Sequence, residues 1–275
     1  MKKTTKALLL KAKRQIFGEL AGNNPSMRAG DGFDFYELRP YMAGEDVRRI
    51  DWKRSARMGE PYVRAFHEER EIQVILVPVM SGSLHFGTHR FKQEVVAELS
   101  ALCGFGALKN GDRFSVVQWQ DGEAAVTPLN RQYAKLEQAI TQIAEQNVLG
   151  HSGTLAGLET VLLQRFKRRA LVIVIGDFWE MPNFGALSQK HEVIALVVRD
   201  MFEEKPKPLG TLRVASPVSL TQQEVTLDTT AIKAHSAKVH AHDSRLFELF
   251  AKQGVRAMKL YTHEHCLSKL HTLFR

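Results

Sequence analysis

Residues 71–80 read Glu71-Ile-Gln-Val-Ile-Leu-Val-Pro-Val-Met80, a nearly continuous apolar run. Such a run without polar alternation is typical of a strand that is buried on both faces of a sheet. Residues 170–175 and 193–198 share this character. Strands that are covered on both faces occur mainly in parallel sheets with helices on each side. These runs therefore predict an α/β fold built on a parallel sheet.

Extended and helical patterns alternate around these strands. Thr154 and Thr262 stand where two of the helices would begin, and a hydroxyl caps a helix well at that position. The alternation predicts a doubly wound, mostly parallel sheet. We expect strands at 71–79, 113–119, 170–175, 193–198 and 255–261, a short antiparallel edge at 124–127, and helices at 4–21, 89–109, 131–146, 154–168, 230–253 and 263–274.

Two segments interrupt the alternation. Residues 206–228 have the pattern of an inserted hairpin, and residues 28–64 show neither a helical nor a strand period. We expect residues 1–64 to form an N-terminal helix and an extended lead-in, and residues 65–275 to form the main domain. The lead-in carries many large apolar side chains, and burying each stabilises the fold by roughly 1.5–3 kcal/mol. We therefore expect it to pack on the core, with Trp52 buried.

Composition and charge limit the classes of protein. The 275 residues are 44% hydrophobic and 25% charged, as in ordinary globular proteins. Two cysteines are too few for a disulfide framework, and no apolar run reaches the ~20 residues of a membrane span. We expect a cytoplasmic protein without membrane insertion. Residues 1–14 carry six basic groups and no acidic one, which suits contact with nucleic acid, a membrane surface or an acidic partner, or simply a solvated helix start.

Hydroxyl and carboxylate side chains follow the buried strands. Ser81 and Ser83 follow the first strand, Asp177 follows the strand at 170–175, and Thr154 lies in the loop before a helix. The carboxyl ends of parallel strands share one edge of a sheet, so we expect these four side chains to converge there. Oxygen ligands of this kind suit Mg²⁺. Alternatively, the hydroxyls cap helices and Asp177 starts a turn.

The chain resembles the domain of unknown function 58 family, whose core resembles the von Willebrand factor A fold. The resemblance covers roughly residues 17–275, and its most specific part is the block from Phe35 to Arg57, Phe35-Tyr-Glu-Leu-Arg-Pro-Tyr-Met-Ala-Gly-Glu-Asp-Val-Arg-Arg-Ile-Asp-Trp-Lys-Arg-Ser-Ala-Arg57. It continues through residues 71–83, 111–113, 152–154 and 176–178. The resemblance implies a von Willebrand factor A type of sheet.

The resemblance also implies a metal-ion-dependent adhesion site. In von Willebrand A domains a D-x-S-x-S loop, a Thr and a later Asp hold the metal. Ser81, Ser83, Thr154 and Asp177 match these positions, but Val79 stands where the first Asp belongs. Pro78 precedes it and removes a backbone donor from a central strand, so we expect a remodelled loop. We expect a degenerate site that binds Mg²⁺ weakly, and no other cofactor.

The signature block is dense in charges of both signs. Arg–carboxylate pairs are rigid, and Trp and Tyr combine an apolar body with a polar tip. The block is interpreted either as a docking surface for a partner or as an internal clamp that holds the lead-in on the domain. For Asp46, Asp51 and Trp52 we favour the clamp. The block's candidate residues are Arg39, Tyr41, Gly44, Asp46, Arg48, Asp51, Trp52 and Arg57.

Three functions remain open. The resemblance implies a non-catalytic protein-interaction module that acts as an adaptor of a MoxR-type AAA+ ATPase and its client proteins. The lack of a nucleotide loop or nucleophile motif agrees with a protein that is not an enzyme. One alternative is a nucleic-acid-binding protein that uses residues 1–14 and the Arg-rich block. The other is a metal-dependent hydrolase, for which one carboxylate is poor provision.

Overall fold

A computed structural model describes residues 3–18, 35–42, 46–66 and 72–274. The chain divides into two compact units, residues 1–22 with 72–275 and residues 23–71. Each unit is described by itself. The N-terminal helix therefore belongs to the larger unit, and the expectation that the lead-in packs on the core stays a prediction.

The larger unit is built on a six-stranded sheet in the order β10-β7-β6-β3-β4-β5. Five strands are parallel, and β5 pairs antiparallel with β4. The first apolar run forms β3 in the interior of the sheet, between β4 and β6, which confirms the doubly wound, mostly parallel fold. The strands are β3 (Gln73–Pro78), β4 (Arg113–Gln120), β5 (Glu123–Val126), β6 (Leu171–Gly176), β7 (Glu192–Arg199) and β10 (Arg256–Tyr261).

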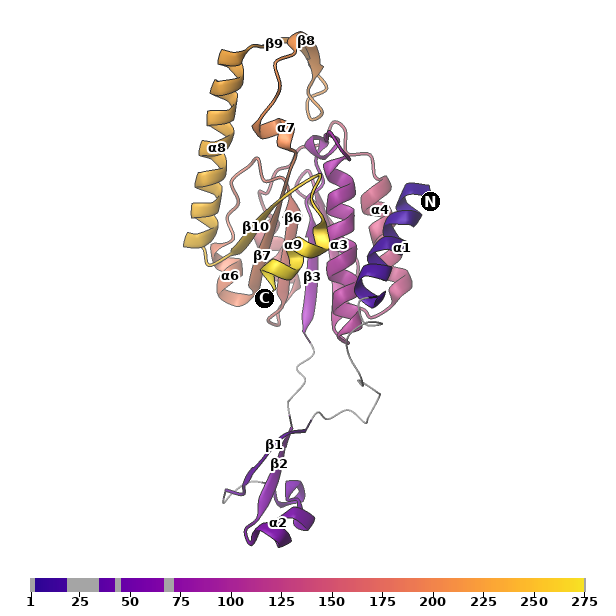
Figure 1. Ribbon diagram of the computed structural model, residues 1–275, viewed down its shortest axis with the longest axis vertical. Coiled ribbons are helices and arrows are strands. Elements are labelled where there is room, and N and C mark those ends of the chain that lie inside the picture. Colours follow the sequence, from indigo (N-terminus) through magenta and orange to yellow (C-terminus); the bar gives the residue numbers. More distant parts are fainter. Residues whose placement is uncertain (1–2, 19–34, 43–45, 67–71, 275) are drawn as a thin grey trace. The chain divides into compact units, whose positions relative to one another are not determined.

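Helices cover both faces of this sheet (Figure 1). One apolar cluster joins the sheet to α1 (Lys3–Gly18), α3 (Lys92–Lys109), α4 (Tyr133–Glu145) and α9 (Cys266–Leu273). The other cluster joins it to α5 (Leu158–Arg165), α6 (Gly185–Lys190) and α8 (Thr229–Lys252). Alternate β3 residues, such as Leu76 and Val77, enter opposite clusters because successive side chains of a strand point to opposite faces. Among the described residues, no helix is long and apolar enough to cross a bilayer.

The inserted hairpin lies where the sequence indicated. It consists of β8 (Gly210–Ala215) and β9 (Gln222–Leu227), paired antiparallel, and it follows the short helix α7 (Met201–Glu204). Both helix caps expected from threonines are wrong. Gly157, in the left-handed region, precedes α5, and His265 precedes α9. The hydroxyl of Thr262 instead donates to Asp200.

Pro78 does not disturb the central strand. It pairs in register with Ile175 of β6, and the Val79 N–H donates to the Ile175 carbonyl over 2.8 Å. The Met80 N–H donates to the Trp119 carbonyl at 2.7 Å. The next residues on the strand thus bond to both neighbours, so the strand continues past Pro78, and the expectation of a remodelled loop after it stays a prediction. Residues 82–84 then form the short 3-10 helix η3 (Gly82–Leu84).

The smaller unit contains β1 (Phe35–Pro40), η2 (Val47–Arg49), α2 (Trp52–Met58) and β2 (Tyr62–Phe66), with β1 and β2 antiparallel. Asp51 caps α2 by accepting from the Arg54 N–H, and Gly59 ends it at φ 78°. The buried Ser55 hydroxyl accepts from the Tyr62 N–H at 2.8 Å, which ties the helix to β2. Side-chain hydrogen bonds thus fix the start of α2 and link this helix to β2.

Candidate interaction site at the carboxyl edge of the sheet

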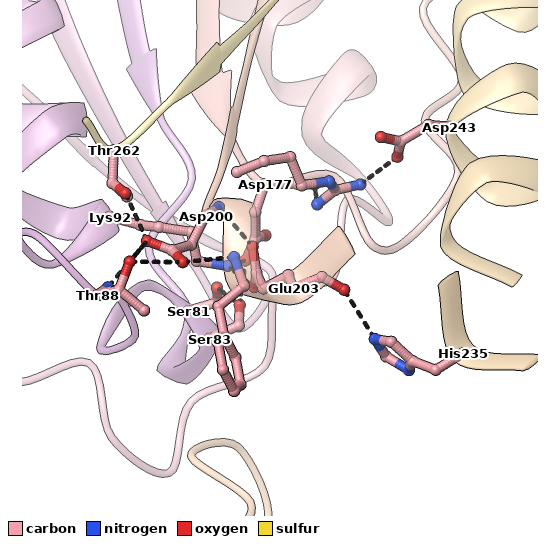
Figure 2. A network of polar contacts seen from close by, with 12 residues as sticks. Ser81, Ser83, Thr88, Lys92, Asp177, Asp200, Glu203, His235, Asp243 and Thr262 are labelled. Atoms are coloured by element: carbon pink, nitrogen blue, oxygen red, sulfur yellow. Dashed lines mark hydrogen bonds and ion pairs between the residues drawn. The ribbon is translucent and has the colours of Figure 1, made fainter. Parts of the chain in front are cut away.

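Three of the four residues expected at the strand ends share one hydrogen-bond network (Figure 2). The hydroxyl oxygens of Ser81 and Ser83 lie 2.7 Å apart, and Ser83 donates to Asp177 Oδ2. Because Ser83 has one hydroxyl proton and gives it to the carboxylate, Ser81 is the donor to Ser83. The loops after β3 and β6 are therefore joined by a directed chain of hydrogen bonds.

A buried lysine completes this network. Lys92 is the first residue of α3, and its side chain is 0% exposed. Its ammonium donates to Asp177 Oδ2 at 3.0 Å and to Glu203 Oε1 of α7 at 2.6 Å. A cation in the first turn of a helix is disfavoured by the helix dipole, so the two carboxylates must hold it there. We call Ser81, Ser83, Lys92, Asp177 and Glu203 the Lys92 cluster.

The ionised form of Asp177 is favoured. Burial alone would raise its pKa, but the Lys92 ammonium, the Ser83 hydroxyl and the Arg199 guanidinium outweigh burial and lower the pKa below its ordinary value. Arg199, at the end of β7, is 0% exposed and also donates to the Asp177 backbone carbonyl. The carboxylate is therefore a weak base with its charge already compensated.

Asp200 fixes the start of α7 beside the cluster. Its carboxylate accepts from the Thr88 N–H at 2.9 Å, from the Thr88 and Thr262 hydroxyls, and from the Phe202 N–H. Glu203 returns a bond, because its Oε2 accepts from the Asp200 N–H at 2.8 Å. This capping box satisfies the N–H groups of Asp200 and Phe202 and gives Glu203 a fixed position facing Lys92.

A second charged chain leads from Arg199 toward α8. Arg199 donates to Asp243 Oδ1 at 2.7 Å, and Lys259 donates to Asp243 Oδ2 at 3.0 Å and to Glu204 Oε1 at 2.7 Å. Burial would raise the pKa of Asp243, but the two cations lower it overall. The guanidinium carbon of Arg199 also lies 3.9 Å from the centre of the Trp179 ring, within cation–π range.

Thr154 is not part of this network. Its hydroxyl oxygen lies 3.4 Å from Glu180 Oε1 and accepts from the Ala156 N–H, while its carbonyl accepts from the Trp119 indole. Its loop nevertheless lies close to the cluster, because a Cβ at Gly153 would come 3.2 Å from Ser81 Cβ. The sequence positions converge, but the Thr154 hydroxyl points elsewhere.

The donor set does not fit a divalent metal. Val79, at the position of the first Asp, is 4% exposed and belongs to an apolar cluster. Asp177 Oδ2 already accepts from Ser83 and from the Lys92 ammonium, and Mg²⁺ at that atom would meet the positive charge of Lys92. Within the described ranges, no three His, Cys, Asp or Glu side chains are grouped to hold a metal.

An apolar pocket of about 410 Å³ adjoins the Lys92 cluster. It lies between the carboxyl edge of the sheet, α7 and the hairpin, and we call it the hairpin pocket. Trp179 is 38% exposed beside it. The His235 ring of α8 donates to the Glu203 carbonyl at 2.8 Å, which ties α8 to α7. The pocket is lined by Ser83, Phe86, Trp179, Phe202, Glu203, Pro206, Pro217, Val225, Leu227 and His235.

The signature block is only partly described. Gly44 lies outside the described residues, as does the side chain of Arg39. Asp46 caps η2 through the Arg48 N–H at 3.0 Å. Asp51 accepts from the backbone N–H of Arg54, and its pairing with a guanidinium stays a prediction.

Trp52 is 67% exposed on α2 of the smaller unit, and its expected burial against the main domain stays a prediction, like the packing on which it depends. Arg48 and Arg57 are exposed and Tyr41 is half-buried. The clamp and the docking surface therefore both remain open for this block.

Comparisons with known proteins define the class. A crystal structure of an aerotolerance-related membrane protein from Bacteroides fragilis is similar with a TM-score of 0.50 and 12% identity, over 74% of this chain and 96% of that chain. The SpRpn10 VWA domain is similar with a TM-score of 0.39 and 11% identity, over 73% and 93%. Together with the sheet order, the similarity to the Bacteroides fragilis structure describes an α/β protein with a mostly parallel central sheet.

The sequence identifies the family. It matches "Protein of unknown function DUF58" over residues 37–245, and the chain belongs to this family. Uncharacterized proteins of Mycobacterium tuberculosis and Mycobacterium bovis are 26% identical over 273 residues, covering 96% of this chain and 86% of each relative. The similarity to solved structures is a similarity of fold alone.

Proposed function

We propose that this chain is a non-catalytic protein-interaction module of the cytoplasm, an adaptor that connects a MoxR-type AAA+ ATPase with client proteins. A von Willebrand factor A-like fold in this family indicates an interaction module. The observation that carries the proposal is the hairpin pocket, an apolar concavity beside a polar cluster whose charges are already paired. In this proposal the adhesion site is degenerate and the pocket beside it receives the partner.

The chemistry of the cluster supports binding rather than catalysis. A general base needs a pKa near the working pH, whereas the pKa of Asp177 is lowered from an ordinary value that is already acidic. The Ser83 hydroxyl donates to this carboxylate, and Lys92 neutralises it. A serine activated for attack needs a base that can take its proton, and this ionised, paired carboxylate is a poor one.

The pocket has the composition of a protein-binding hot spot. Aromatic side chains from three segments, Phe86, Trp179 and Phe202, line it, with Val225 and Leu227 on the hairpin side. Aromatic anchors in concave, desolvated sites contribute most of the free energy of protein association. The pocket is of a size to receive one or two large apolar side chains of a partner.

Affinity capture tests the proposal. The tagged chain is exposed to its native cytoplasm with and without a non-hydrolysable ATP analogue, and bound proteins are identified by mass spectrometry. We expect a MoxR-type ATPase as the main partner and weaker capture by Leu227→Glu, which puts a charge in the pocket. Thr226→Glu is the matched control, because Thr226 is exposed on the opposite side of β9. Equal loss with both variants, or no ATPase among the bound proteins, would contradict the proposal.

The basic N-terminus has a structural use that weighs against nucleic acid as the main partner. Lys11 of α1 forms an ion pair with Glu98 of α3 at 2.7 Å, and Lys13 pairs with Glu137 of α4. Lys109 in turn donates to the Ile16 carbonyl at 2.8 Å. Capture that is insensitive to salt over the range that dissociates phosphate contacts would agree with this interpretation.

A further inference from the structure

We infer that Lys92 is the resident cation of the degenerate adhesion site and makes this site independent of divalent metal. The inference deepens the proposed function, since it concerns the edge of the sheet where the partner is proposed to bind. Its test uses the isolated protein and needs no partner.

Geometry supplies the first argument. The Lys92 ammonium lies 3.0 Å from Asp177 Oδ2 and 2.6 Å from Glu203 Oε1, and the side chains are 0%, 5% and 14% exposed. Asp177 is the carboxylate that matches the metal-ligand position of the family's relatives by fold. Ser83, which matches a second ligand position, donates to the same oxygen that accepts from Lys92. The ammonium thus neutralises the carboxylate that a metal would otherwise bind.

The second argument is the cost of keeping a lysine at this position. A buried ammonium is strongly disfavoured unless it is paired, and its position in the first turn of α3 adds the opposing helix dipole. Two carboxylates from separate elements converge on it, and Asp200 fixes one of them through the capping box. Two carboxylates held in place around one ammonium are expected where the positive charge is a fixed part of the site.

The third argument is what the charge does to the loops. Lys92 links α3 to the end of β6 through Asp177 and to α7 through Glu203. In a metal site the ion holds loops of this kind together, and here the Lys92 side chain makes the link (Figure 2). The edge of the sheet is therefore organised before any ligand binds, and removal of divalent ions should not loosen it.

Removal of the ammonium tests the inference directly. Lys92→Ala leaves Asp177 and Glu203 facing a space next to two hydroxyls, which a divalent ion could occupy. We expect millimolar Mg²⁺, Mn²⁺ or Ca²⁺ to raise the melting temperature of Lys92→Ala by a few degrees and to leave the unmodified protein unchanged. Methylammonium should also raise it, because it restores the missing group. Addition of EDTA should leave the melting temperature of the unmodified protein unchanged.

A matched control is available in the same domain. Lys259 also bridges two carboxylates, Glu204 and Asp243, whose other partners include Tyr261 and Arg199 and not the serine hydroxyls. Lys259→Ala should gain less from divalent ions than Lys92→Ala, and Lys92→Ala/Ser83→Ala should lose part of the gain. An equal rise in melting temperature for the two lysine variants would overturn the inference. It would show that divalent ions bind at any carboxylate pair that has lost its lysine.

The unmodified protein gives a second test that does not require the variant to fold. Calorimetric titration with Mg²⁺ or Mn²⁺ should release little heat, and micromolar binding, or a fall of the melting temperature in EDTA, would overturn the inference. ATPase capture that fails in all conditions would contradict the proposed function and leave these measurements intact. Capture that is abolished by EDTA while the isolated protein binds no metal would place the metal requirement in the partner.

Discussion

The Lys92 ammonium lies 3.0 Å from the Asp177 carboxylate, and the two side chains are 0% and 5% exposed. An ion pair this deeply buried contributes little net stability compared with an apolar pair of the same shape, but loss of one partner is expensive. The reason is that the remaining charge stays buried without compensation. This asymmetry makes the pair a strong determinant of which loops meet at the carboxyl edge of the sheet.

Lys92→Met should therefore destabilise the larger unit. The methionine keeps most of the volume but leaves Asp177 and Glu203 without their shared cation, so we expect a loss of about 3–5 kcal/mol in the free energy of unfolding. Urea denaturation followed by far-ultraviolet circular dichroism measures this. The control is Arg256→Gln, which removes an ion pair with Glu192 in which both side chains are 49% exposed. That loss should be no more than about 1 kcal/mol. If the two variants lost similar free energies of unfolding, burial would not be the reason why the Lys92 ion pair matters.

Asp200→Asn should change how stability depends on pH. Burial by itself would raise the pKa of Asp200, but hydrogen bonds from Thr262, Thr88 and Phe202 lower it overall. A lowered folded-state pKa gives stability that is present above the ordinary pKa and is lost as pH falls through the folded value. The unmodified protein should therefore exceed Asp200→Asn by about 1–3 kcal/mol at pH 7. The difference should shrink as the pH falls below about 4.

Urea denaturation at a series of pH values measures this difference. Glu192→Gln is the control, since Glu192 is half-exposed and its pair with Arg256 is solvated. Its difference from the unmodified protein should stay small throughout. A stability difference between Asp200→Asn and the unmodified protein that grows toward low pH would show that the pKa of Asp200 is not lowered in the folded state.

Most of the sheet could be predicted from sequence because its strands are apolar on both faces. The run that begins at Glu71 forms β3 as Gln73–Pro78, and the runs at 170–175 and 193–198 form β6 and β7. The convergence of Ser81, Ser83 and Asp177 also followed from sequence, because a parallel sheet brings the carboxyl ends of its strands to one edge. The strand order of a parallel sheet alone was sufficient to predict that these residues lie together.

The charged partners at this edge could not be predicted in the same way. A lysine at the start of a helix is usually solvated, and the burial of Lys92 depends on Asp177 and Glu203, which are 85 and 111 residues away. Arg199 and Asp200 directly follow the apolar run at 193–198. Their position at the end of a buried strand indicates that they lie at the same edge of the sheet as Asp177. Pro78 does not interrupt β3, because the N–H groups of the next two residues bond to β6 and β4 in the usual way.

Gly82→Ala should disrupt the contact between the serine loop and the hairpin. A Cβ at Gly82 would lie 2.0 Å from the Pro217 carbonyl oxygen, so either η3 or the hairpin turn must move. We expect a loss of about 1–3 kcal/mol in stability and weaker ATPase capture, because Pro217 lines the hairpin pocket. Gly106→Ala is the control, since its Cβ would meet nothing within 4 Å and the residue lies inside α3. That change should stabilise by about 0.5–1 kcal/mol. Destabilisation by both would refute the steric explanation.

Trp52→Ala separates the two interpretations of the signature block. Trp52 is 67% exposed on α2, and Val47 and Met58 in the same unit are 56% and 63% exposed. Exposed apolar side chains in one small unit favour a surface that receives a partner. We expect Trp52→Ala to change the free energy of unfolding by less than about 1 kcal/mol and to weaken ATPase capture about tenfold or more.

Two variants on the same helix make this measurement decisive. Lys53→Ala, also exposed, should leave both stability and capture nearly unchanged. Asp51→Ala removes the cap of α2 and should cost about 1 kcal/mol, which calibrates the sensitivity of the denaturation assay to this unit. A loss of about 3–5 kcal/mol from Trp52→Ala with unchanged capture would instead show that the tryptophan is buried against another part of the chain. In that case the signature block is a clamp, and docking depends on the hairpin pocket alone.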